Sequence, residues 1–180
     1  ASQMVAQYLD PKPGMRVIDA CAGAGGKSLH MAALMENKGS ILSLDIYPKK
    51  LEELKRRARR NGAHNIETRL IDSNKVIKKL MGKADRLLID APCTGLGVLR
   101  RNPGSKWKLS PEFLEEIIEK QQEILAAYAP MLKADGEMVY ATCSILPQEN
   151  KQQIDRFLKT EMGQNFKIIK EQTLLPSATN

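Results

Sequence analysis

Residues 15–27, MRVIDACAGAGGK, decide the fold of this chain. An apolar run leads into a glycine-rich turn, and the following residues 28–35, SLHMAALM, suit a helix. Strand, glycine loop and helix form the opening unit of a doubly wound nucleotide-binding fold. Such a loop presents backbone N–H groups and a helix N-terminus to a ligand, and glycine permits the close approach. A glycine-rich turn can also be only a tight turn, so the rest of the chain must identify the ligand.

The composition indicates a soluble domain with an anionic partner. The chain has 180 residues, of which 42% are hydrophobic, and no apolar run approaches the length of a membrane span. The net charge of +7 favours nucleic acid, although a basic protein need not bind any. Cys21, Cys93 and Cys143 form no CxxC pair, which argues against a disulfide framework or a metal site. We therefore expect a monomer in the reducing cytoplasm, without metal or membrane partner.

Strands and helices are expected to alternate along the chain. Strands are expected at 16–20, 40–45, 66–71, 85–90, 137–142 and 166–170, and helices at 2–9, 28–35, 48–60, 76–81, 110–132 and 147–161. Residues 134–136, ADG, are expected to form the turn before the fifth strand, and the long loop 91–110 is expected to be functional. The alternation predicts an α/β fold: a Rossmann-like, doubly wound, mostly parallel sheet with helices on both faces.

Carboxylates stand at or near the ends of four expected strands. They are Asp19, Asp45, Asp72 and Asp90, and Cys143 follows the end of the fifth strand. In a parallel sheet the ligand lies beyond the carboxyl ends of the strands, so these side chains would converge on one cleft. Each acid taken alone could equally be a turn or cap residue.

These acids favour a cofactor with cationic groups over one with several phosphates. The loop departs from the dinucleotide motif at Ser28, which does not exclude a dehydrogenase, and from the P-loop at Cys21. S-adenosylmethionine carries a sulfonium and an ammonium but no phosphate. Asp45 would accept hydrogen bonds from its ribose hydroxyls, and Asp72 from its adenine amino group.

Two cysteines at neighbouring strand ends point to methylation of a pyrimidine. Cys93 follows Pro92 where amino-methylating enzymes need an aromatic residue, and Cys143 lies between Thr142 and Ser144. A strand cysteine is usually a small hydrophobe, but carbon 5 of a pyrimidine reacts only after a thiolate has added to carbon 6. Asp90 would hydrogen-bond or protonate the ring nitrogen of a base that is single-stranded or flipped out. This chemistry leaves open which cysteine is the nucleophile.

Four motifs make the chain similar to a known family. They are the loop at 19–27, DAPCTG at 90–95, RRNP at 100–103 with KWK at 106–108, and YATCS at 140–144 followed by EN at 149–150. Over nearly its whole length the chain resembles the Sun/Nop (RsmB-like) family of S-adenosylmethionine-dependent RNA cytosine-5 methyltransferases, which have a class I methyltransferase fold. The resemblance implies that Cys143 is the nucleophile and that Cys93 assists release of the methylated RNA.

The resemblance also assigns binding residues. The cofactor would be held by Cys21, Ala22, Gly23, Ala24, Gly25, Gly26, Lys27, Asp45, Asp72 and Asp90. The RNA would be contacted by Pro92, Arg100, Arg101, Lys106 and Lys108, while Trp107 either stacks on a base or packs within its loop. We expect ribosomal RNA as substrate, with transfer RNA and a catalytically idle RNA-binding module as the alternatives. The basic helix 48–60 is expected to be solvated and not to contact RNA.

The chain departs from the family pattern in its cofactor loop and at its end. The family loop usually reads Ala-Pro-Gly-Gly-Lys, and the absence of proline around Ala24 and Gly25 is expected to loosen it. The family sheet has a seventh, antiparallel strand paired with the sixth. We therefore expect residues 1–180 to be a single catalytic domain that lacks this last strand and is a fragment of a longer protein.

Overall fold

The structure, a computed structural model, describes residues 2–174 in two compact units. The sheet unit comprises residues 2–90 and 127–140, and the cysteine unit comprises residues 91–126 and 141–174. The expectation of a single domain remains a prediction.

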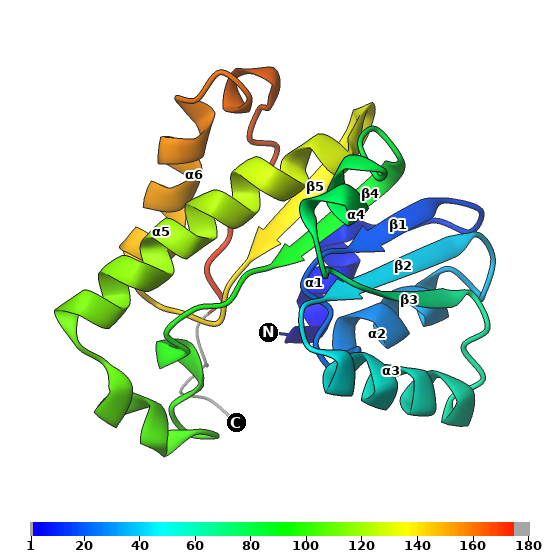
Figure 1. The fold of residues 1–180 in the computed structure, drawn as a ribbon, viewed down its shortest axis with the longest axis horizontal. Helices are drawn as coiled ribbons and strands as arrows, with labels where there is room; N and C mark the ends of the chain where they lie inside the picture. Colours follow the sequence, from blue (N-terminus) through cyan, green and yellow to red (C-terminus); the bar gives the residue numbers. More distant parts are fainter. Residues whose placement is uncertain (1, 175–180) are drawn as a thin grey trace. The chain divides into compact units, whose positions relative to one another are not determined.

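A five-stranded sheet forms the centre of the sheet unit (Figure 1). Its strands are β1 (Arg16–Asp19), β2 (Ser40–Asp45), β3 (Ile66–Leu70), β4 (Ala84–Asp90) and β5 (Leu132–Ala141). The strand order is β3-β2-β1-β4-β5, and β1 pairs in parallel with both β2 and β4. This order confirms the predicted doubly wound sheet. It reverses between β1 and β4, and such a reversal is where sheets of this kind bind ligands.

Buried apolar residues lie on both faces of this sheet. Val17, Ile41 and Leu88 pack against the first two helices, and α3 adds a second cluster through Leu54 and Ala58. The helices of this unit are α1 (Ser2–Leu9), α2 (Gly26–Leu34), α3 (Pro48–Arg60), α4 (Asn74–Lys78) and the 3₁₀ turn η3 (Ala129–Met131). Because strand side chains alternate, the neighbours of these core residues face the opposite side. Ile18, Leu42 and Leu87 there are also buried.

The cysteine unit consists of irregular loops and two packed helices. Its elements are η1 (Leu96–Val98), η2 (Pro103–Lys108), most of α5 (Pro111–Tyr128), η4 (Pro147–Glu149), α6 (Lys151–Leu158) and η5 (Gly163–Asn165). Arg156 on α6 donates two hydrogen bonds to the Glu119 carboxylate on α5, at 2.6 and 3.0 Å. The Gln122 side chain on α5 donates to the backbone carbonyl of Gln153 at 2.8 Å. These contacts join α6 to the middle of α5.

Several expected elements differ in the structure. The helix expected at 76–81 lies earlier, as α4, and the helix expected at 110–132 ends at Tyr128. Residues 166–170 form no strand, and the Phe166 ring packs edge-on against Phe157. The expected turn at 134–136 lies inside β5, where Lys133 forms an ion pair with Asp85 at the start of β4. The expected helix 147–161 is divided into η4 and the shorter α6.

No helix within residues 2–174 is long and apolar enough to cross a membrane. The same residues contain no group of three or more His, Cys, Asp or Glu side chains that could hold a metal ion.

Candidate active site

The loop between β1 and α2 is fixed by three contacts from β2 and α3. Its Gly23 N–H donates to the Asp45 carboxylate at the end of β2, at 2.8 Å. The Arg57 guanidinium on α3 donates to the Ala24 carbonyl at 2.7 Å. Gly25 has a φ of 83°, and a Cβ placed on it would lie 2.3 Å from Cγ of Leu54. The glycine is therefore required both by backbone conformation and by packing.

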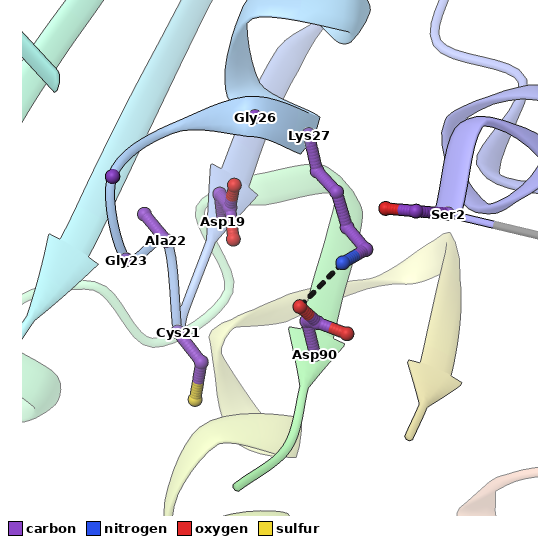
Figure 2. A pocket seen from close by; sticks show the side chains of 9 residues that line it. Ser2, Asp19, Cys21, Ala22, Gly23, Gly26, Lys27 and Asp90 are labelled. Carbon is purple, nitrogen blue, oxygen red and sulfur yellow. Dashed lines mark hydrogen bonds and ion pairs between the residues drawn. The ribbon is translucent and has the colours of Figure 1, made fainter. Parts of the chain in front are cut away.

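This loop lines a pocket of about 220 Å³ at the carboxyl ends of β1 and β4 (Figure 2). The residues that line it are Ser2, Asp19, Cys21, Ala22, Gly23, Ala24, Gly26, Lys27 and Asp90. Figure 2 shows Lys27 reaching from the start of α2 to Asp90 at the end of β4. Their ion pair has an N–O distance of 2.5 Å and closes one side of the pocket.

Asp19 is the buried acid of the pocket. Its Oδ2 accepts a hydrogen bond from the Ser28 hydroxyl at 2.6 Å, while its Oδ1 is buried without a partner among the described residues. Burial raises the pKa of Asp19 to about 7, against the lowering effect of the Ser28 hydrogen bond. Burial also raises the pKa of the Cys21 thiol, and the negative charges of Asp19 and Asp90 add to that shift. Without a ligand, Cys21 is therefore a neutral thiol.

Two of the four strand-end acids do not line the pocket. Asp45 is buried behind the loop, where its oxygens accept the N–H groups of Gly23 and Tyr47, each at 2.8 Å. Asp72 is exposed and accepts a hydrogen bond from its neighbour Ser73. The structure thus brings Asp19 and Asp90 together in the pocket, and the cofactor contacts expected of Asp45 and Asp72 remain predictions.

The cysteine unit brings the other two thiols together. The sulfur atoms of Cys93 and Cys143 are 3.2 Å apart, and the Cys143 N–H points at the Cys93 sulfur at 3.3 Å. Their hydrogen bond raises the pKa of Cys93 far above its ordinary value, and burial adds to the shift. Cys93 therefore keeps its proton, while Cys143 is the more exposed of the two.

The residues expected to contact RNA are exposed in the same unit. Pro92, Arg100, Arg101 and Lys106 are all exposed, and none of the three cations forms an ion pair with a residue of 2–174. Lys106 lies over the Trp107 ring at 4.7 Å, and Trp107 is 82% exposed, so the indole does not pack within its loop. The Lys108 side chain lies outside the described part of the chain.

Several site residues escaped the sequence analysis. Ser2 lines the pocket, and a buried group of Thr94, Gln121 and Glu149 lies beside Cys93. Glu149 belongs to the EN pair that follows the second cysteine motif, but nothing local indicates that its carboxylate is buried. The available signal was Gln121, a polar residue on the side of α5 that is buried. A polar side chain at such a position indicates that it has buried polar partners.

Comparison with known proteins gives concordant matches. The model of a family described as 16S rRNA methyltransferase RsmB/F matches residues 6–177. The chain is 41% identical over 160 residues to the probable ribosomal RNA small subunit methyltransferase B of Bacillus subtilis, and 39% identical over 160 residues to that of Synechocystis. In both cases the match covers 88% of this chain and 36% of the relative, so the chain spans about a third of their length.

A solved structure supports the same relationship. The chain is 32% identical to NSun6 from Pyrococcus horikoshii, solved with SFG, and superposes on it with a TM-score of 0.79. The match covers 88% of this chain and 40% of that protein.

Proposed function

We propose that this chain, which belongs to the 16S rRNA methyltransferase RsmB/F family, is the catalytic part of an enzyme that methylates carbon 5 of a cytosine in ribosomal RNA. The observation that carries the proposal is the pair of thiols, Cys93 and Cys143, whose sulfur atoms are 3.2 Å apart. Two adjacent thiols suit a reaction in which one sulfur adds to a base and the other assists its departure. The names of the curated relatives favour ribosomal over transfer RNA.

The pocket of the sheet unit fits S-adenosylmethionine as the methyl donor. Asp19 has a buried oxygen without a partner among the described residues, and Asp90 supplies a second carboxylate. The one lysine of the pocket, Lys27, is already paired with Asp90. These groups would repel a polyphosphate and attract a ligand with cationic groups. The relative solved with SFG, an analogue of S-adenosylmethionine, agrees with this choice.

Cys143 is the proposed nucleophile because it is the more exposed thiol of the pair. Its thiolate forms a bond to carbon 6 of the cytosine, and the electron pair of the ring double bond moves to carbon 5. A proton on the ring nitrogen, held there by a hydrogen bond to the Asp90 carboxylate, would favour this step by withdrawing electron density. When bound, S-adenosylmethionine supplies the methyl group that carbon 5 accepts.

Cys93 is the proposed release residue. Carbon 5 must lose its proton to water, after which the bond between carbon 6 and the Cys143 sulfur breaks and the electron pair returns to that sulfur. The raised pKa of Cys93 keeps it a thiol, which suits a hydrogen-bond donor to the departing sulfur and not a base. Its distance of 3.2 Å from the Cys143 sulfur is suitable for that bond.

The exposed cations of the cysteine unit are proposed to hold the RNA strand. Arg100, Arg101 and Lys106 lie in a loop with the exposed Trp107 ring, on which an unpaired base can stack. A flipped or single-stranded cytosine is required because neither face of carbon 6 is accessible within a helix.

The test combines methyl transfer to bacterial ribosomal RNA with two cysteine variants. Cys143→Ser should abolish methyl incorporation but leave S-adenosylmethionine binding, measured by calorimetry, unchanged. Cys93→Ser should instead accumulate a covalent protein–RNA adduct that survives a denaturing gel. Bisulfite mapping of the methylated RNA identifies carbon 5 of cytosine as the product site. Cofactor binding without any methyl transfer by the unaltered protein would favour the idle RNA-binding module.

A further inference from the structure

Two consecutive residues just before α6, Glu149 and Asn150, each bond to a different cysteine loop. Glu149 has no exposed surface, and its Oε2 accepts the Thr94 hydroxyl at 2.5 Å. Its Oε1 accepts the Thr94 N–H at 2.8 Å and the Gln121 side-chain amide at 3.0 Å. The same Gln121 amide donates to the Pro92 carbonyl at 2.9 Å. Glu149 thus holds the residues on both sides of Cys93.

Asn150 makes the corresponding contacts with the loop of Cys143. Its Oδ1 accepts the Thr142 hydroxyl at 2.6 Å, and its Nδ2 donates to the carbonyls of Ser144 at 3.0 Å and Leu146 at 2.8 Å. These bonds lie on both sides of Cys143 in the chain. The side chain therefore fixes the backbone that carries the second sulfur atom.

The positions of both sulfur atoms depend on these side-chain contacts. The Thr94 hydroxyl also lies 3.3 Å from the Ser144 hydroxyl, which joins the two loops directly. Backbone contacts between the loops are sparse: Ala91 N–H donates to the Ala141 carbonyl, and Gly97 N–H to the Cys143 carbonyl. A buried carboxylate is costly unless its oxygens are hydrogen-bonded, so Glu149 resists any movement of Thr94 that would break its bonds.

We propose that Glu149 and Asn150 are positioning residues that keep the Cys93 thiol in contact with the Cys143 sulfur. The effect on release of the product rests on the proposed function, whereas the effect on the two thiols does not. The raised pKa of Cys93 agrees with this arrangement, because its largest cause is the hydrogen bond to Cys143.

The test measures the thiols themselves in Glu149→Gln and Asn150→Ala. Alkylation by iodoacetamide at pH 8, followed residue by residue in a mass spectrometer, should become about tenfold faster at Cys93 in Glu149→Gln. A thiol whose pKa falls by one unit has about ten times more thiolate. The effective concentration of the Cys93–Cys143 disulfide, measured against glutathione, should fall about tenfold in both variants.

Phe157→Leu is the matched control for general loss of stability. The Phe157 side chain is buried on α6 and takes no part in the hydrogen bonds that Glu149 and Asn150 make with the two cysteine loops. It should leave both thiol measurements unchanged, and alkylation of Cys21 should stay constant in every variant. If Glu149→Gln fails to fold, Thr94→Val removes one hydroxyl donor to Glu149 while keeping the Thr94 N–H bond, and it should shift both measurements in the same direction. Thiol measurements that match the unaltered protein in all these variants would overturn the proposal.

A third measurement separates positioning from function. With ribosomal RNA and S-adenosylmethionine, Glu149→Gln should accumulate more covalent adduct than the unaltered protein, because the departing sulfur has lost its hydrogen-bond donor. Changed alkylation rates and disulfide effective concentrations, with no adduct in any variant including Cys93→Ser, would uphold the positioning of the thiols and refute the covalent mechanism. The same changes in the two thiol measurements, with an adduct only in Cys93→Ser, would refute the role of Glu149 in release.

Discussion

Asp19 makes the stability of the sheet unit depend on pH. Its pKa is raised from 3.8 to about 7, mainly by burial, so the folded state holds the proton more tightly than the unfolded state. Stability from this group is complete below about pH 4 and is lost as the pH rises through 7. Relative to Asp19→Asn, the unaltered protein should lose up to about 4 kcal/mol of unfolding free energy between pH 4 and pH 7.5.

Urea denaturation at several pH values measures this difference. The comparison with Asp19→Asn removes the contributions of other carboxylates, which are common to both proteins. Ser28→Ala provides a control, because it removes the 2.6 Å hydrogen bond that lowers the pKa of Asp19 and should move the loss of stability to higher pH. Parallel stability curves for the unaltered protein and Asp19→Asn would show that Asp19 titrates normally.

Candidate site residues could be named from the sequence where a local motif contains them, and their roles remain predictions. Cys93, Cys143, Asp90 and Lys27 stood in recognisable stretches, and the structure pairs them as two thiols and one ion pair. Glu149 was not predicted as a buried contact of the Cys93 loop. Burial of a carboxylate is decided by partners far away in the chain, and local sequence carries no sign of them.

The loop between β1 and α2 depends on a glycine for its packing against α3. Gly25→Ala places a methyl group 2.3 Å from the Leu54 Cγ and forces alanine into a φ of 83°. The backbone cost is about 1–2 kcal/mol, and overpacking adds about 1–3 kcal/mol. We therefore expect a loss of about 2–5 kcal/mol of unfolding free energy, measured by urea denaturation, together with weaker binding of S-adenosylmethionine.

Gly14→Ala is the matched control for the backbone term. Gly14 has a φ of 91°, but a Cβ placed on it meets no atom within 4 Å. The difference between the two variants then measures the clash with Leu54 alone. Leu54→Ala should cost less unfolding free energy in the Gly25→Ala variant than in the unaltered protein, because it removes the clash. Equal losses in Gly14→Ala and Gly25→Ala would show that Leu54 moves aside without cost.

The elements of the sheet unit were largely predictable because their signals are local. Apolar runs that end in a carboxylate predicted β1, β2 and β4, and the apolar side of α3 predicted its buried residues. Two features did not follow from local sequence. The run at 166–170 forms no strand, although its local sequence suits one, and Arg57 anchors the loop that the lack of proline was expected to loosen.

At the scale of the whole molecule, the net charge of +7 predicts salt-dependent binding to RNA, and we propose that exposed cations of the cysteine unit are responsible. Arg100 and Arg101 are exposed in the cysteine unit, whereas Arg59 and Arg60 are exposed at the end of α3 in the sheet unit. Each phosphate contact to a single strand contributes about 0.7 to the slope of log affinity against log salt. Replacing Arg100 and Arg101 by Gln should therefore reduce the slope by about 1.4 for a single-stranded oligoribonucleotide.

The double variant Arg59→Gln with Arg60→Gln changes the net charge by the same amount and is the control for that measurement. These two arginines lie in the last turn of α3, where their positive charges stabilise the helix by interacting with its dipole. Their presence therefore has a structural reason that does not involve RNA. Their replacement should leave the slope unchanged in fluorescence anisotropy titrations between about 50 and 200 mM salt. Equal reductions of the slope in both variants would mean that RNA affinity depends on the total charge of the protein. The loop of Arg100 and Arg101 would then not be a distinct contact surface.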